Sequence, residues 1–433
     1  MDHSSNKAFR AAGLVAGVVL SMAIALPAAA QMIIAEPMRI GVIMPPVDPA
    51  APAWEQSVAR GAAQGALIAE DEFVFNAEML GMQMSLVRAT ATTAEEAVAA
   101  ATQLVEQDGV YAIIGGYDNA QAAAIGAWAE EANIPFVNVG GASDSLRNEA
   151  CHATTFHLEP SAAMYIDAIA GWYVRAGFRR WYVVTDGSEE SLAQQAHLTQ
   201  TLQERHFGIR QVAQQTMAPG GPVPDNLVSE IARNNADFVL ILMGAADQLA
   251  VMTALDQAGV DMQVTGFPYP ETQTRAYFVA MQAAAPTIGT NNRVTTWEAT
   301  LDAYGAREMN ARYRQQFREP MDASAWATYQ AVKILYEAAF FGGSLDPAAV
   351  VAFMAAPTSV FDVYKGIGTS FRPWDRQLRQ TLFLDKISDE PVPDTFNMAI
   401  LVGELPAIYM AGTDPVERLD QLGTTAAQST CGR

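Results

Sequence analysis

The chain has 433 residues, half of them hydrophobic, and its 47 acidic residues against 26 Lys and Arg give a formal net charge of -21. This apolar fraction excludes a disordered chain, and the length predicts two domains, with three as the alternative. The acidic balance argues against nucleic acid or anionic lipid as partners, because both attract a basic surface.

The first thirty residues have the pattern of a cleaved secretory signal. A positive start at Lys7 and Arg10 precedes an uncharged apolar run over 11–26, and small residues follow up to Ala30. We therefore expect residues 1–30 to be removed near Ala30 and the mature chain to be exported. An N-terminal membrane anchor is the alternative interpretation of this segment.

Export would place the two cysteines, Cys151 and Cys431, in an oxidising compartment. This favours a disulfide between them, which would tie the C-terminal segment to the first half of the fold. Two independent buried thiols are the alternative. The spacing has no CxxC character, so neither redox catalysis nor a zinc site is predicted.

Short β-rich runs alternate with helix-length segments from Met38 onward, which is typical of stacked βαβ units. The strand-like runs are nearly continuously apolar, as in parallel strands covered by helices on both faces. They include residues 38–44, 84–89, 111–116, 135–141, 179–185 and 237–244. Because the series runs twice, over about 38–155 and 161–290, we predict an α/β fold with two doubly wound parallel-sheet lobes.

Capping signals support two of the predicted helices. Thr93 with Glu96 forms a capping box, and Asp118 with Gln121 makes a similar helix start. Helical character dominates 303–354, and a last β-like run covers 381–387. The remaining residues show little periodicity and predict a surface tail.

The chain lacks the motifs of nucleotide and zinc enzymes: no GxxxxGK[ST], no GxGxxG after the first strand and no HExxH occurs. His152 and His157 lie beside Cys151, but their spacing on a strand would place them on opposite faces. We expect no catalytic residue, no cofactor and no metal. Two facing lobes predict instead a cleft that closes on a small molecule.

Four segments match one family in order and spacing: GVIMPP at 41–46, the helix at 60–72, and the segments at 92–116 and 124–146. Together they resemble the periplasmic solute-binding proteins of branched-chain amino-acid type ABC importers. The resemblance implies a type I periplasmic binding protein fold with three crossings between the lobes. It also implies a periplasmic location, a small solute as ligand and an ABC permease in the inner membrane as partner.

From this resemblance we expect a definite division of the chain. Lobe 1 would comprise 31–155 and 297–368, lobe 2 would comprise 156–296 and 369–395, and 396–433 would form the tail.

Three further segments resemble a narrower branch of the family: 146–170, RRW at 179–181 and SFRPWDRQLRQ at 370–380. This branch is associated with PQQ-dependent alcohol dehydrogenase systems and tends to end near a cysteine, as at Cys431. The resemblance implies a role beside periplasmic alcohol oxidation. The Arg, Trp and Asp side chains of 370–380 are expected to brace the hinge rather than to contact ligand.

The resemblance places the lobe 1 side of the ligand site on three loops. Its candidates are an aromatic cover, a helix start after the third strand and a small-residue loop after the fourth: Trp54; Tyr117, Asp118 and Asn119; Gly140, Ala142 and Ser143. Each has a structural alternative. These are a surface Trp under a Pro-rich loop, cap residues of a helix, and a turn that needs glycine for its dihedrals.

Lobe 2 departs from the amino-acid pattern. Pro268 stands where amino-acid binders carry the carboxylate that grips the ligand ammonium, and Glu190 replaces an aromatic residue. Tyr269 and Glu271 are candidate substitutes. This departure puts α-amino acids in doubt, and the acidic candidates favour a neutral or cationic solute.

These observations predict a monomeric, non-enzymatic, periplasmic solute-binding component of an ABC importer. The alternative is a ligand-sensing or interaction module that serves a periplasmic dehydrogenase or receptor, with a degenerate cleft and no transport role. A filled or collapsed cleft would distinguish the second from the first.

Overall fold

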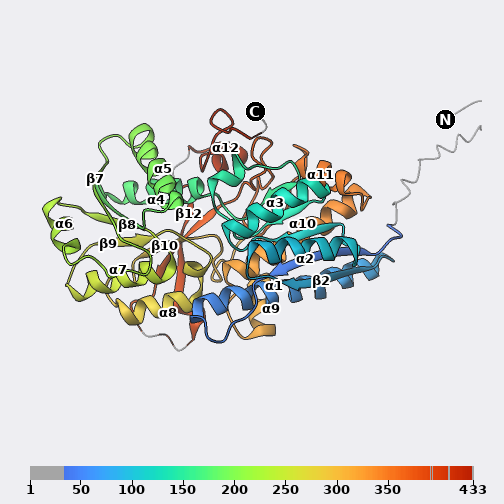
Figure 1. Ribbon diagram of the computed structural model, residues 1–433, viewed down its shortest axis with the longest axis horizontal. Helices are drawn as coiled ribbons and strands as arrows, with labels where there is room; N and C mark the ends of the chain where they lie inside the picture. The colour runs from blue at the N-terminus through green and yellow to red at the C-terminus, as the bar shows by residue number, and fades with distance from the viewer. Residues whose placement is uncertain (1–33, 391, 393, 408–409, 432–433) are drawn as a thin grey trace, which may run out of the picture. The chain divides into compact units, whose positions relative to one another are not determined.

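The computed structural model describes residues 34–390, 392, 394–407 and 410–431 (Figure 1). The expected signal segment 1–30 and its cleavage point near Ala30 lie outside the described residues. The described residues belong to one compact unit.

The first sheet is parallel, with strand order β2-β1-β3-β4-β5. Its strands are β1 (Met38–Met44), β2 (Met84–Thr90), β3 (Ala112–Gly115), β4 (Phe136–Asn138) and β5 (Thr155–His157). Side chains alternate between its faces. Val42 packs in the cluster formed with α1 and α10, and Ile43 packs in the cluster formed with α2 and α3. We call this sheet and its helices lobe 1.

The helices of lobe 1 follow from local signals as well as packing. Thr93 and Glu96 form the expected capping box, and the Asp118 side chain accepts from the Gln121 amide. The helices are α1 (Ala53–Met79), α2 (Ala94–Glu106), α3 (Asn119–Ala132), the short η1 (Asp144–Arg147), α10 (Ala323–Gly342) and α11 (Pro347–Ala355).

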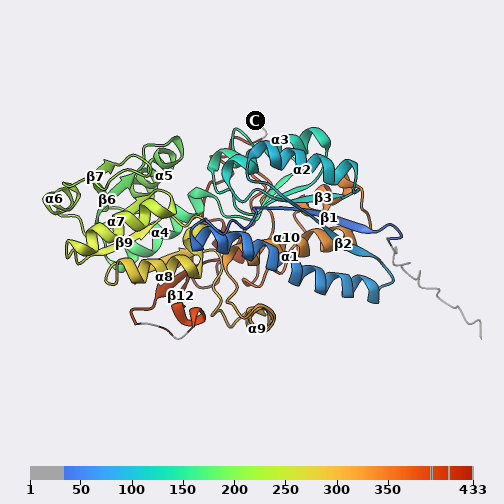
Figure 2. The ribbon, with the colours of Figure 1, turned by 60° about the horizontal axis from the view of Figure 1, so that its bottom comes forward.

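Helices α1 and α10 lie side by side (Figure 2) because glycine allows their backbones to meet. A Cβ added at Gly65 would lie 2.3 Å from the Ala325 carbonyl oxygen. Any side chain there would push the two helices apart.

The second sheet is also parallel, with strand order β7-β6-β8-β9, and forms lobe 2 with the helices around it. Trp181 and Val183 face the α4 side of the sheet, whereas Tyr182 and Val184 face the α7 side. Its strands are β6 (Arg180–Thr185), β7 (Arg210–Thr216), β8 (Phe238–Leu242) and β9 (Gln263–Gly266). Its helices are α4 (Ala162–Ala176), α5 (Glu189–Arg205), α6 (Leu227–Arg233), α7 (Ala245–Gln257), η2 (Glu271–Gln273) and α8 (Arg275–Ala284).

A third, antiparallel sheet in the order β10-β11-β12 was not expected from the sequence. It consists of β10 (Asn292–Thr295), β11 (Leu382–Ile387) and β12 (Ala399–Leu405). Leu382 and Leu384 of β11 pack into the core of lobe 2, and Phe383 between them packs into the core of lobe 1. The third sheet therefore joins the two cores.

The expectation of a surface tail over 396–433 is wrong for its described residues. β12 pairs with β11 along its length, and Leu405, Leu419 and Leu422 are buried. The remaining elements here and nearby are α9 (Ala306–Phe317), η3 (Thr395–Met398) and α12 (Pro415–Leu419). The tail prediction failed because β12 has a mixed burial pattern and is a strand through its antiparallel pairing with β11, the strand that precedes it.

Cys151 and Cys431 form a disulfide with a Cα–Cα distance of 5.6 Å across 280 residues of sequence. Cys151 lies just beyond η1, and Cys431 follows the segment after α12. The bond fastens the end of the described chain to lobe 1.

The segment 370–380 braces the crossings between the lobes, as expected. The Gln377 side-chain amide donates to the carbonyls of His157 and Glu159 in the first crossing, at 3.1 and 3.0 Å. Arg372 is 1% exposed and forms ion pairs with Asp375 and Asp420. Its Nε and Nη2 groups donate to Asp420 and to the carbonyls of Leu419 and Leu422, so they are used inside the protein.

No single helix among the described residues is long and apolar enough to cross a membrane. The bent pair α10 and α11 passes that criterion by length and composition only.

Candidate functional site

Two hollows open where the strands of lobes 1 and 2 end, which is where doubly wound sheets bind ligands. The first, which we call the α5 hollow, measures about 380 Å³. It is lined by Asn119 and Ala162, by 143–145 and 148–149 after β4, and by 189–190 and 193–194 at the start of α5. Both lobes thus contribute to its walls.

The second, the α1 hollow, measures about 520 Å³ and lies beyond the ends of β1, β2 and β3. Its lobe 1 wall is formed by residues 45–46, 48, 51, 55–56, 58–59, 91–92, 117–118 and 121. Glu271 of η2 closes it from lobe 2. Adjacent residues of the α3 start, Asp118 and Asn119, thus face different hollows.

The structure brings together six of the ten predicted ligand residues at these hollows. Asn119, Ser143 and Glu190 line the α5 hollow, and Tyr117, Asp118 and Glu271 line the α1 hollow. The other four, which do not line either hollow, are Trp54, Gly140, Ala142 and Tyr269.

Glu190 lies at the contact between the lobes. Burial raises the pKa of this carboxyl, and hydrogen bonding with Asn119 of lobe 1 and with Tyr269 opposes that rise. The Gln194 side-chain amide donates to Glu190 at 3.3 Å and to the Tyr269 hydroxyl at 3.2 Å. Tyr269 therefore supports the α5 hollow through Glu190 and Gln194 rather than by lining it.

Glu271 is the corresponding carboxyl at the α1 hollow. Burial, and then the charges of Glu55 and Asp118, raise its pKa. Asp118 itself caps α3 through the Gln121 amide at 2.8 Å. The capping interpretation of Asp118 therefore holds in the structure, and its position on the hollow is additional to it.

Asn119 does not cap α3, because its side-chain oxygen accepts from the Ser143 amide at 2.9 Å. This bond fixes the loop after β4 against the start of α3. Tyr117 is 4% exposed, and its hydroxyl pairs with Thr328 of α10 at 2.6 Å. Its hydroxyl is thus occupied within lobe 1.

The small residues after β4 have a structural role in this arrangement. A Cβ on Gly140 would lie 2.6 Å from the Tyr117 Cα, so glycine is required for the two loops to meet. The Asn138 side chain accepts from the amides of Gly140 and Gly141. Ala142 is 2% exposed and packs in the core of lobe 2.

Trp54, the expected cover, packs instead against lobe 2. Its ring meets that of Tyr277 on α8 edge to face, with centroids 5.7 Å apart. The side chain joins the lobe 2 core cluster that contains Tyr277.

The sequence profile of the periplasmic binding protein family matches residues 37–390. This chain belongs to the periplasmic binding protein family. A comparison with curated proteins gave no match.

Solved structures show the same fold in ABC transporter binding proteins. A branched-chain amino acid ABC transporter periplasmic ligand-binding protein from Burkholderia xenovorans LB400 superposes with a TM-score of 0.77 at 16% identity, covering 91% of this chain and 99% of that chain. A branched-chain amino acid transporter substrate-binding protein from Streptococcus pneumoniae, in complex with isoleucine, gives a TM-score of 0.67 at 17% identity and covers 85% and 99%. An ABC transporter solute-binding protein from R. palustris, in complex with benzoate, gives a TM-score of 0.68 at 15% identity. The match covers 92% of this chain and 100% of that chain. The chain thus has the type I periplasmic binding protein fold.

Sequence reasoning missed one residue that is central to the α5 hollow of this periplasmic binding protein. Gln194 is 1% exposed, and its position four residues after Glu190 places both on one face of α5. That spacing was the available signal. Asp144, the first residue of η1, also lines the hollow and was missed because a helix of one turn shows no periodicity in the sequence.

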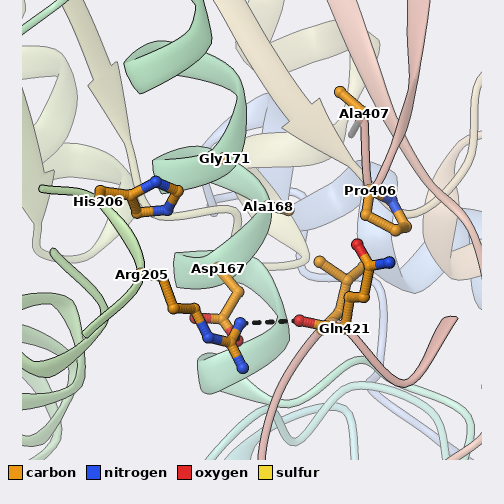
Figure 3. A pocket seen from close by; sticks show the side chains of 9 residues that line it. Asp167, Ala168, Gly171, Arg205, His206, Pro406, Ala407 and Gln421 are labelled. Carbon is orange, nitrogen blue, oxygen red and sulfur yellow. Dashed lines mark hydrogen bonds and ion pairs between the residues drawn. The ribbon is translucent and has the colours of Figure 1, made fainter. Parts of the chain in front are cut away.

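A third pocket lies on the far side of α4, between the end of α5 and the C-terminal segment (Figure 3). Arg205 donates to the Gln421 carbonyl at 2.8 Å and pairs with Asp167. Asp167 also accepts from Thr201 and from the Gly423 amide. These contacts hold the C-terminal segment of this periplasmic binding protein against α4 and α5. The polar atoms involved are hydrogen-bonded or ion-paired with one another.

Within the part of the chain that the structure describes, no three His, Cys, Asp or Glu side chains are grouped to hold a metal ion. His152 pairs with Glu130 at 2.5 Å, whereas the His157 ring lies at 3.0 Å from the Asn138 amide. The two histidines therefore belong to separate contacts.

Proposed function

We propose that this protein is the periplasmic solute-binding component of an ABC importer, which closes its two lobes on a small solute. The observation that carries this proposal is a pair of hollows walled by both lobes at the carboxyl ends of parallel strands, in a chain of the periplasmic binding protein family. Volumes of about 380 and 520 Å³ suit a small molecule.

The proposal includes the setting in which the protein works. Residues 1–30 direct export and are cleaved near Ala30, and the mature chain acts as a monomer that delivers its solute to an inner-membrane permease. A non-enzymatic role is supported by the substrate-binding proteins that share the fold. The solute is neutral or cationic, since the predicted site carries the carboxylates of Asp118, Glu190 and Glu271.

A link to PQQ-dependent alcohol oxidation forms a finer part of the proposal. It is supported by the resemblance of 146–170, 179–181 and 370–380 to the branch associated with those systems. Two of these segments contact each other, because Arg147 donates a hydrogen bond to the Gln377 side-chain oxygen at 2.8 Å.

The alternative, an interaction or sensing module that serves a periplasmic dehydrogenase or receptor, would be favoured by a collapsed cleft. The two open hollows favour solute binding over it. Co-purification of the exported protein with a dehydrogenase, together with a lack of any bound solute, would reverse this preference.

Thermal-shift measurements followed by isothermal titration test the proposed function. The purified mature protein is screened against short alcohols, their aldehydes and acids, amides, amines and amino acids. A solute that binds the native state raises the melting temperature by mass action. A folded protein that no class of small solute stabilises would contradict the proposal.

A further inference from the structure

The ionisable side chains that line the α5 hollow are all acidic. Asp144, Glu149, Glu189 and Glu190 line it, and none of its described lining residues is Lys, Arg or His. The nearby Arg147 is directed elsewhere, since its guanidinium donates to the carbonyls of Gly141, Ser143 and Glu159. A solute that enters this hollow therefore meets acidic side chains in its lining, whereas His197 and Arg147 act on Asp144 without lining the hollow.

The carboxyl groups of this hollow differ in their hydrogen bonds and in their surroundings. One oxygen of Asp144 accepts from the Ala163 amide at the start of α4, at 3.0 Å. Glu190 lies at the contact between the lobes, where burial raises its pKa, and its neighbours Asp186 and Asp144 raise it further. A positive charge beside Glu190 would offset both effects.

An unpaired hydrogen-bond acceptor lies beside Glu190. The Gln194 amide nitrogen donates to Glu190 and Tyr269, while its carbonyl oxygen has no hydrogen-bond partner. A flipped Gln194 amide would place its carbonyl oxygen against the Glu190 carboxylate, and two acceptors would then face each other. The Glu190 carboxylate therefore determines the orientation in which the amide nitrogen points toward it. A buried acceptor without a donor costs about 1–3 kcal/mol, which a ligand N–H group would remove.

The α1 hollow also combines an acidic lining with a buried amide oxygen that has no hydrogen-bond partner. Asp48, Glu55, Asp118 and Glu271 line it, and its described lining again includes no cationic side chain. Gln121 is 4% exposed, and its carbonyl oxygen also lacks a partner.

An inorganic cation fits this arrangement poorly. Carboxylate ligands to a divalent ion must converge within about 2.6 Å of one point. No group of three acidic, His or Cys side chains in the described ranges does so. The charge is instead spread along a hollow of about 380 Å³, which suits an organic molecule.

We propose that the solute is a small organic cation with N–H donors, a protonated amine or a guanidinium, held in the α5 hollow by the Glu190 carboxylate and the Gln194 carbonyl oxygen. This inference rests on the proposed function and specifies the class of its solute. Because Asn119 and Ser143 of lobe 1 also line the hollow, the same cation contacts both lobes and favours closure.

Titration calorimetry with size-matched probes tests the solute class. The probes are n-butylammonium, 1,4-butanediammonium and n-propylguanidinium as cations, with n-butanol, butyramide and butyrate as neutral and anionic counterparts, and CaCl₂ as an inorganic cation. We expect binding of at least one organic cation, weakened by added NaCl, and no comparable binding of the counterparts.

Site variants locate the bound cation. Glu190→Gln removes the charge at nearly constant size and should weaken the binding of the cation by roughly tenfold or more. Gln194→Met removes the carbonyl acceptor at similar volume and should weaken it as well. Glu204→Gln makes the same charge change at an exposed position near the far end of α5 and should leave the affinity unchanged. Circular dichroism establishes that each variant is folded.

The outcomes separate this inference from the proposed function. Preferential binding of a neutral or anionic probe overturns the cation inference and leaves the binding function intact, and so does tighter binding of Ca²⁺ than of any amine. Cation binding that Glu190→Gln and Glu204→Gln affect equally overturns the assigned site. If no probe or screened solute binds, the proposed function fails too.

Discussion

The ring of Trp54 at the start of α1 stands edge-on to the ring of Tyr277 on α8, with centroids 5.7 Å apart and planes at 88°. This contact joins lobe 1 to lobe 2 on the side of the α1 hollow. Close by, the Arg275 amide donates to the Asp322 carboxylate of lobe 1. The start of α1 therefore packs against the start of α8 and helps to hold the lobes together.

Removal of the Trp54 ring should loosen the contact between the lobes. We expect Trp54→Ala to lose about 0.5–1.5 kcal/mol of aromatic interaction and to increase the radius of gyration in X-ray scattering. Solute affinity should fall with the population of closed protein. Trp54→Phe, which retains a ring, should lie close to the wild type. An Ala variant with unchanged scattering and unchanged affinity would show that this contact does not control closure.

A side chain at Gly140 should disrupt the loop on which the α5 hollow is built. The Cβ of Gly140→Ala would lie 2.6 Å from the Tyr117 Cα and 2.7 Å from its carbonyl oxygen. We expect a loss of about 1–3 kcal/mol in the free energy of unfolding, measured by urea denaturation. Gly171→Ala is the matched control, because nothing lies within 4 Å of its added Cβ in the middle of α4. It should be neutral or stabilising by up to about 1 kcal/mol.

The buried carboxyl of Glu159 in the first crossing should make stability depend on pH. Burial raises its pKa from 4.5 to about 8, although Tyr165 donates to it at 2.7 Å and Arg147 and Lys365 oppose the rise. The folded state therefore holds this proton more tightly than the unfolded state. Its contribution to stability is complete below pH 4.5 and is lost as the pH rises through about 8.

Glu159→Gln keeps the side chain neutral and should reduce this loss. We expect the variant to gain in free energy of unfolding relative to the wild type between pH 5 and pH 8.5, as measured by urea denaturation at both values. Each tenfold difference in proton affinity between the folded and unfolded states corresponds to about 1.4 kcal/mol, and the rise of this pKa from 4.5 to about 8 spans more than one such factor. Glu131→Gln, an exposed change on α3, is the control for the loss of a carboxylate at the surface. Parallel curves for Glu159→Gln and wild type would contradict the assignment.

The Cys151–Cys431 disulfide should stabilise the mature protein. It closes a loop across 280 residues, so its reduction enlarges the unfolded ensemble. We expect dithiothreitol, or the Cys151→Ser/Cys431→Ser double variant, to lower the free energy of unfolding by roughly 2–5 kcal/mol. The double variant should no longer respond to reductant. A wild-type protein equally stable with and without reductant would show that the C-terminal segment is held by other contacts, such as Arg372 with Asp420.

The architecture was largely predictable because its signals are local. The apolar runs of β1 and β8 are buried throughout or nearly so, and the Thr93–Glu96 box starts α2 where the sequence indicated. Burial on both faces requires continuous apolar character, and a cap requires particular side chains within one turn. Both requirements can therefore be recognised from residues that are close together in the sequence.

The third sheet and the surroundings of the site were decided by tertiary structure. β12 has a mixed burial pattern and is a strand because β11 supplies its hydrogen-bond partners. The long-range contacts of Trp54 with Tyr277 and of Glu190 with Tyr269 join residues that are far apart in the chain.

The sequence by itself thus determined the two parallel-sheet lobes, the acidic character and the loops that line the hollows. Only the tertiary structure decided that Trp54 packs between the lobes and that Gln194 presents an unpaired acceptor. Periodicity reports which face of an element is buried, whereas the partner of a buried polar atom depends on elements that meet only after folding.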